Sequence, residues 1–190
     1  MGIIILQKAI RFATAVHVGQ TRKGKSEVPY ITHPLAVALI LARVGASEDV
    51  ITAGILHDTV EDSHGKVAVA DISREFGDAV AKLVDYVTEK DHDLLSWEER
   101  KSTARAHIAD MSHDALLLKS ADILYNLRDL LADLEETGEE VWLRFNAPKE
   151  KQIEHHMKLA VVLSKVWPEN PLLSEVQTAV GWLKSLPTSL

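Results

Sequence analysis

With 190 residues, 46% hydrophobic and 26% charged, the chain has the composition of a globular protein that is long enough to bury a hydrophobic core. Its formal net charge of −7 disfavours a broad nucleic-acid-binding surface, and the absence of cysteine excludes disulfides and thiolate-bound zinc. The longest apolar run, 35–42, is far shorter than the roughly 20 residues of a membrane span. We therefore expect a cytoplasmic protein that binds neither nucleic acid nor membrane.

Apolar residues at helical spacing predict helices along most of the chain. The segments with this pattern, in chain order, are 3–18, 34–44, 47–62, 72–76, 78–88, about 96–111 and 115–136. Ser47 and the Ser96–Glu99 capping box mark two helix starts, and Gly45 and Gly138 mark two ends. Two last helices begin near Pro148 and Pro171.

Residues 19–30 read as a polar loop, and no segment has the pattern of a strand. The expected fold is therefore all-α: a compact helical bundle that forms one domain over 1–190. The motifs described below lie in a core of about 3–146, and we expect packing helices over about 147–186.

The polar loop carries three positive charges within four residues, Arg22, Lys23 and Lys25. In an acidic protein, such a local cluster suits a small polyanion better than a nucleic-acid duplex. Taken alone, a solvated surface loop would be the simpler interpretation. The position of the cluster just before His33, a candidate metal ligand, favours a role in binding a small polyanion.

The hexapeptide 57–62 concentrates groups that bind metals or move protons. On a helix, residues four apart lie on one face, so Glu61 follows His57 by one turn and Asp62 follows Asp58 by one turn. This pattern is explained if His57 and Asp58 hold a cation while Glu61 and Asp62 act on a water molecule beside it.

Two further residues complete a ligand set. His33 directly precedes a proline at an expected helix start, and Asp122 stands in an otherwise apolar helical run. A buried carboxylate is costly unless it is paired, either with a neighbouring side chain or with a cation. With His57 and Asp58, these residues offer two imidazoles and two carboxylates, which suit manganese, iron or zinc. Such an ion lowers the pKa of a bound water, and the resulting hydroxide can attack phosphorus.

The order of these motifs resembles the HD-domain metal-dependent phosphohydrolases, and among them the Rel/Spo-type small, stand-alone alarmone hydrolases. The matching segments are, in order, 11–13, His17, 19–23, 29–34, 37–38, 57–62, 121–122 and 124–130. The resemblance covers about 9–130 and weakens after that. It implies an all-helical HD-type bundle that removes pyrophosphate from the 3′ position of guanosine tetra- or pentaphosphate, giving GDP or GTP, usually with manganese.

The resemblance also implies roles for particular residues. Glu61 and Asp62 become the catalytic acidic pair. Four residues are placed around the nucleotide: Arg22, Lys23, Tyr30 and Asn126. Where the small hydrolases carry a tyrosine near the nucleotide, this chain has Arg144, which would stack on a base or clamp a phosphate; a purely structural arginine is the alternative. For His17 we expect a packed or hydrogen-bonded side chain.

Two functional classes remain open at this point. The first is a hydrolase of the guanosine alarmones with one divalent ion, manganese before others, and a small guanine nucleotide as its partner. The alternative is an HD-type phosphohydrolase of another nucleotide, such as a 2′- or 3′-phosphate or a dinucleotide phosphate. A non-catalytic binding module is disfavoured because the ligand and acidic residues are all present. The oligomeric state stays open.

Overall fold

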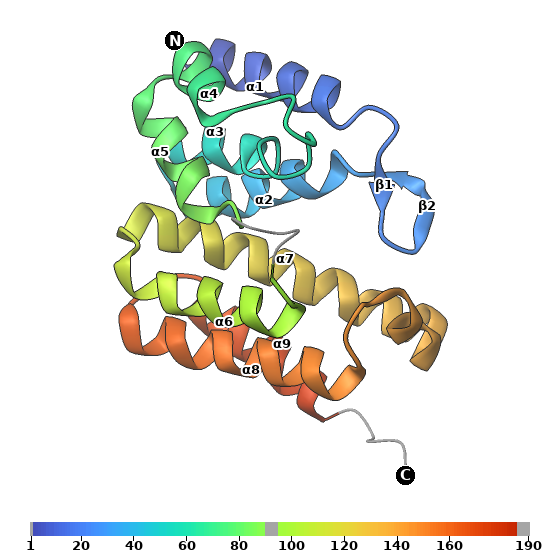
Figure 1. Cartoon of the computed structure of the whole chain (residues 1–190). Helices are drawn as coiled ribbons and strands as arrows, with labels where there is room; N and C mark the ends of the chain where they lie inside the picture. Colours follow the sequence, from blue (N-terminus) through green and yellow to red (C-terminus); the bar gives the residue numbers. More distant parts are fainter. Residues whose placement is uncertain (1, 90–94, 186–190) are drawn as a thin grey trace. The chain divides into compact units, whose positions relative to one another are not determined.

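The computed structural model describes residues 2–89 and 95–185, which divide into two compact units (Figure 1). The first unit comprises Met1–Lys90 and Met111–Asp122, and the second comprises Asp91–Asp110 and Ile123–Leu190. The units are interleaved in sequence and share one helix, so they are not consecutive domains. The predicted organisation as one domain, with a core of about 3–146, stays a prediction.

The first unit is built around a short buried helix. Its elements are α1 (Gly2–Val16), β1 (Thr21–Arg22), β2 (Lys25–Pro29), α2 (Thr32–Arg43), α3 (Glu48–Leu56), α4 (Val69–Phe76), α5 (Asp78–Val87) and the first part of α7 (His113–Thr137). Helix α3 packs against α1, α2 and α5, which are drawn in blue to green in Figure 1. At Gly54 a Cβ atom would lie 2.6 Å from Leu41 Cδ1, so the missing side chain lets α2 and α3 approach closely.

The polar segment before α2 corrects the expectation that the chain has no strands. Strands β1 and β2 pair antiparallel, and Lys23 and Gly24 form the turn between them. Gly24 has a φ of 78°, which only glycine adopts without strain, and this allows the tight reversal. Strands of two and five residues are too short to show the alternation that marks a strand in sequence. Elsewhere in the described residues the all-α prediction is confirmed.

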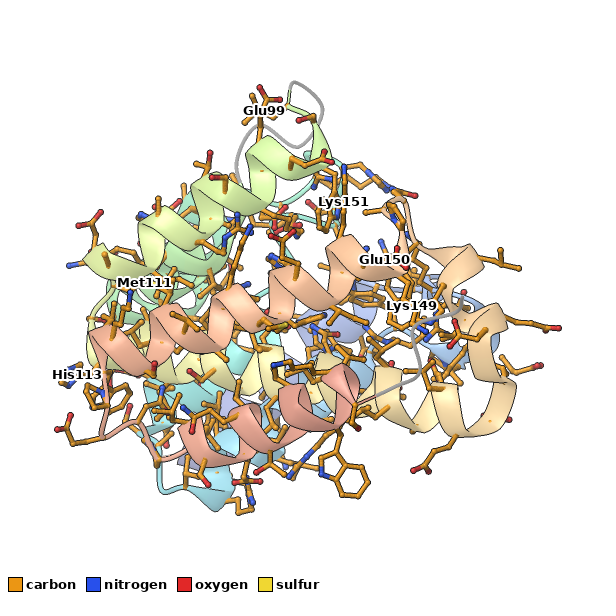
Figure 2. All side chains as sticks on the ribbon, turned by 90° about the horizontal axis from the view of Figure 1, so that it is seen from below. Glu99, Met111, His113, Lys149, Glu150 and Lys151 are labelled. Atoms are coloured by element: carbon orange, nitrogen blue, oxygen red, sulfur yellow. The ribbon has the colours of Figure 1, made fainter. Side chains whose placement is uncertain are left out.

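The second unit is entirely helical within its described residues. Its elements are α6 (Trp97–His107), the 3-10 helix η1 (Ile108–Asp110), the rest of α7, the 3-10 helix η2 (Gly138–Arg144), α8 (Lys149–Val166) and α9 (Leu173–Lys184). Helix α8 packs against α6, η1 and α9. The predicted capping box is present, because the backbone N–H of Ser96 donates to Glu99 Oε2 over 2.9 Å. Figure 2 shows Glu99 at the start of α6 and Lys149 and Lys151 in the first turn of α8.

A search of the helices in the described part of the chain finds none with the length and hydrophobicity needed to cross a bilayer.

Candidate active site

The four predicted metal ligands converge in the first unit. His33 lies in the first turn of α2, His57 and Asp58 directly follow the last residue of α3, Leu56, and Asp122 lies on α7. The two Nε2 atoms of His33 and His57 are 3.1 Å apart, and Asp58 Oδ2 is 3.2 Å from each. Asp122 Oδ1 lies 3.5 Å from His33 Nε2 and 3.9 Å from His57 Nε2. Both imidazoles are buried.

These separations fit a single divalent ion. Ligand atoms about 2.1 Å from an ion and about 90° apart lie about 3.0 Å from one another, and wider angles give longer separations. The Nδ1–H of His57 donates to the carbonyl oxygen of Gly54 over 2.9 Å, which leaves the Nε2 lone pair for the cluster. His33, His57 and Asp58 thus form a group that can hold a metal, and Asp122 extends it.

The charges within the cluster also suit a cation. Burial alone would lower the pKa of His57, but the adjacent Asp58 carboxylate raises that pKa to about 9. Burial alone would raise the pKa of Asp58, but the His57 charge and hydrogen bonds from both histidines hold it well below its usual range. Asp58 therefore stays ionised, and a metal ion would replace the proton on the imidazole.

Two side chains donate hydrogen bonds to the two carboxylates of the cluster. The Tyr30 hydroxyl donates to Asp58 Oδ2 over 2.7 Å, and burial, followed by the Asp58 charge, raises the tyrosine pKa so that this proton is kept. Lys119 Nζ donates to Asp122 Oδ2 over 3.0 Å, while Oδ1 faces the histidines. Such contacts orient ligands and tune their basicity. Lys119 was not among the predicted site residues, although its position three before Asp122 on one helix was a usable signal.

The predicted cationic residues lie on the small sheet. The Arg22 guanidinium carbon is 5.6 Å from the centroid of the Tyr30 ring, and Arg22 is half-buried. Lys23 is exposed in the turn between the strands. Arg22 is thereby linked through Tyr30 to Asp58, one of the predicted metal ligands. The predicted contacts of Arg22, Lys23 and Tyr30 with a nucleotide stay predictions.

The helix predicted to run to Asp62 ends earlier, at Leu56, and turns follow it. The Thr59 hydroxyl and backbone N–H both bond the Leu56 carbonyl oxygen, at 2.6 and 2.9 Å, and so compete with the regular helical hydrogen bond. Asp62 still follows Asp58 by one turn, because its N–H donates to the Asp58 carbonyl over 2.9 Å. The predicted relation of these two residues is kept even though the helix is not.

The acidic pair has the electrostatics of proton-transfer groups. Glu61 Oε2 accepts the backbone N–H of Glu89 over 2.9 Å. Burial, followed by the Asp58 charge, raises the pKa of Glu61 to about 7, and the same two causes raise the pKa of Asp62. Carboxyl groups with a pKa near neutrality are suited to general acid–base catalysis.

This shift gives a pH dependence. Glu61 accepts a proton only when ionised, so we expect kcat to fall about tenfold per pH unit well below the pKa of Glu61. Burial and the Asp58 charge raise this pKa to about 7 without metal, and a bound cation opposes that shift, so the acid limb of the metal-loaded protein should lie below pH 7. Glu61→Gln should abolish the limb, whereas Asp71→Asn, at a carboxylate outside the site, should keep it. The measurement is kcat as a function of pH. If Glu61→Gln keeps the decrease of kcat at low pH, that decrease belongs to a group other than Glu61.

The other two predicted substrate residues belong to the second unit. Asn126 lies on α7 and Arg144 ends η2. The Arg144 guanidinium forms an ion pair with the buried carboxylate of Asp133, which gives the structural alternative a named partner. Contact of Asn126 and Arg144 with a substrate stays a prediction.

Sequence reasoning missed Gln20. Its side-chain Nε2 donates to the backbone carbonyl of Asp62 over 2.9 Å, and its Oε1 lies 2.6 Å from His17 Nδ1. His17 is buried and hydrogen-bonded, as expected. The spacing of three residues just after α1 was the only local signal for this pair.

Most of the chain is similar to known proteins. A family model described as "HD domain" matches residues 9–150. The guanosine-3′,5′-bis(diphosphate) 3′-pyrophosphohydrolase MESH1 of Xenopus tropicalis is 42% identical over 128 residues, which cover 66% of this chain and 69% of that protein. A GTP pyrophosphokinase of Streptomyces coelicolor is 42% identical over 127 residues, but the chain spans only 14% of its length.

Two solved structures are similar along most of the chain. The crystal structure of a Listeria monocytogenes protein, lmo0812, has a TM-score of 0.72 and 36% identity, covering 80% of this chain and 97% of that one. A metazoan ortholog of SpoT, described as hydrolysing ppGpp, has a TM-score of 0.76 and 28% identity, covering 96% of this chain and 97% of that one.

Proposed function

Because this chain belongs to the HD domain family, we propose that its metal centre removes the 3′-pyrophosphate from guanosine tetra- or pentaphosphate, giving GDP or GTP and pyrophosphate. The observation that carries the proposal is the convergence of two imidazoles and two carboxylates beside an acidic pair whose pKa values are raised. Relatives that share this region are named as hydrolases of the same nucleotide.

The proposed cofactor is one divalent ion, manganese in the first place. When bound, such an ion lowers the pKa of a water ligand and polarises a phosphoryl oxygen. His33, His57, Asp58 and Asp122 would hold it, since their donor atoms already face one another. Tyr30 and Lys119 would keep the two carboxylates turned toward it.

The chain's own groups would handle the protons and the phosphate charge. Glu61, with its pKa raised toward neutrality, would accept the proton of the attacking water. Asp62 would orient that water and return a proton to the departing 3′ oxygen. Arg22 and Lys23 would offset the charge that develops on the transferred group. Tyr30 and Asn126 would complete the contacts with a small guanine nucleotide.

The test compares nucleotides under one condition. Protein loaded with manganese would be incubated with guanosine tetraphosphate, a nucleoside 3′-phosphate, a 2′-phosphate and a dinucleotide phosphate, and the products identified. We expect pyrophosphate from the tetraphosphate at the highest kcat/KM. Orthophosphate from one of the other nucleotides at a higher kcat/KM would favour the alternative class of HD phosphohydrolase. A chelator-treated sample is the control.

Arg144 tests both interpretations of the departure from the small hydrolases. Arg144→Ala leaves the buried Asp133 carboxylate without this partner, and we expect a loss of about 3 kcal/mol in the free energy of unfolding. If Arg144 also contacts the nucleotide equally in ground and transition states, KM for the tetraphosphate should rise while kcat is kept. Asp133→Asn is the matched control, because it breaks the pair but keeps the arginine. If KM for the tetraphosphate is the same in both variants and in the wild type, Arg144 does not contact the nucleotide and its role is structural.

A further inference from the structure

We propose that His17 is a positioning residue for the catalytic Asp62 and that it acts through Gln20. The inference rests on the proposed function, in which Asp62 orients the attacking water and transfers a proton. It concerns the support of that carboxyl group and assigns His17 no contact with substrate or metal.

A directed chain of hydrogen bonds joins His17 to Asp62 through Gln20. Gln20 Nε2 donates to the Asp62 carbonyl oxygen over 2.9 Å, so the Gln20 amide is oriented with its Oε1 toward His17. Since Oε1 only accepts, the His17 Nδ1 at 2.6 Å must carry the hydrogen. The Gln20 backbone is held as well: its N–H donates to the His17 carbonyl over 3.0 Å, and its carbonyl accepts the Tyr30 N–H over 2.9 Å.

Asp62 needs a side chain such as Gln20 to hold its backbone in place. It lies in the turns after α3 and not inside a helix, so regular backbone hydrogen bonding fixes it less than it fixes His33 or Asp122. The side-chain amide of Gln20 donates a hydrogen bond to the backbone carbonyl of Asp62, the residue whose carboxyl group is proposed to act in catalysis. A misplacement of about 1 Å in a catalytic group costs about a hundredfold in rate.

Packing alone does not explain a histidine at position 17. The His17 side chain is 3% exposed, and its Nε2 is buried with no hydrogen-bond partner among the described residues. A buried unpaired polar atom is costly, and an aliphatic side chain would fill the space without that cost. What an aliphatic residue cannot supply is the Nδ1–H that holds Gln20.

The ring of His17 also contacts Tyr30. It lies 4.9 Å from the Tyr30 ring, centroid to centroid, at an interplanar angle of 36°. The Tyr30 hydroxyl in turn donates to Asp58. His17 is therefore in contact with the two side chains that hold Asp62 and Asp58, the acid and the metal-binding carboxylate one turn apart.

The test is a mutant cycle with Asp62. His17→Leu and Gln20→Met keep side-chain size and remove the hydrogen bonds. We expect each to lower kcat for guanosine tetraphosphate about 10- to 100-fold, with KM and bound manganese unchanged. His17→Asn, which keeps an N–H donor near the Nδ1 position, should recover most of that loss. In an Asp62→Asn background, His17→Leu should lower kcat no further, because residues that act as one unit are not additive.

Other outcomes would overturn the inference. They are a wild-type kcat in His17→Leu, an equal fold-loss in the wild-type and Asp62→Asn backgrounds, or no recovery in His17→Asn. If His17→Leu does not fold, Gln20→Met in the same two backgrounds gives the decision. Absence of pyrophosphate release by the wild-type protein removes the proposed function itself, whereas wild-type turnover with an unaffected His17→Leu removes this inference alone.

Discussion

His57→Ala and Asp122→Ala will each lose the bound divalent ion and turnover together. Each change deletes one of four donor atoms whose separations fit a single ion. A bound metal supplies several kcal/mol of transition-state stabilisation, so its loss should lower kcat by about 10³-fold or more. Metal content by elemental analysis and kcat on the same samples give the measurement.

The control is His64→Asn. His64 is exposed and lies in the following turn with a left-handed backbone, which asparagine also adopts, so this variant should keep its metal. Full metal content in His57→Ala or Asp122→Ala would contradict the ligand assignment of that residue. Metal-free Asp122→Ala should also unfold more easily than metal-free wild type, because the change leaves Lys119 without its carboxylate partner.

Glu61→Gln and Asp62→Asn will lower kcat by about 10²–10⁴-fold while the metal is retained, the usual range for general acid–base groups. Both substitutions keep the shape of the side chain, but the amide can neither accept a proton, as proposed for Glu61, nor donate one as an acid, as proposed for Asp62. Burial and the Asp58 charge raise the pKa of both carboxyl groups, which supports this role. The measurement is kcat together with bound metal in each variant.

A half-buried carboxylate outside the site provides the comparison for this pair. Asp71→Asn changes the same functional group outside the site and should leave turnover as it is. Near-wild-type turnover in both Glu61→Gln and Asp62→Asn would refute the proton-transfer role. A loss of metal in either variant would instead move that residue into the ligand set.

Much of the first unit could be predicted from local pattern. Helix positions follow from apolar spacing and from capping residues such as Ser47, whose hydroxyl accepts the Val50 N–H as expected. The adjacent pair His57 and Asp58 and the isolated Asp122 were conspicuous because ionisable groups are seldom placed among apolar residues without a partner. The structure brings these residues together as the ligand hypothesis requires.

What could not be predicted depends on contacts between distant segments. The bonds from Tyr30 to Asp58 and from Gln20 to Asp62 join residues 28 and 42 positions apart. The periodicity of apolar residues along the sequence does not predict contacts between residues so far apart. The early end of α3 is a local effect of a different kind, because the Thr59 hydroxyl takes the Leu56 carbonyl and overrides the helical pattern.

The position of the new oxygen in the products distinguishes removal of the 3′-pyrophosphate from other cleavages of the nucleotide. Manganese-loaded protein would hydrolyse guanosine tetraphosphate in water labelled with oxygen-18, and the products would be analysed by mass spectrometry. Attack of a metal-activated water on the phosphorus next to the 3′ oxygen breaks the bond between them. We expect one heavy oxygen in the released pyrophosphate and none in GDP. Orthophosphate as the labelled product, or a heavy oxygen in GDP, would contradict 3′-pyrophosphate removal at this site.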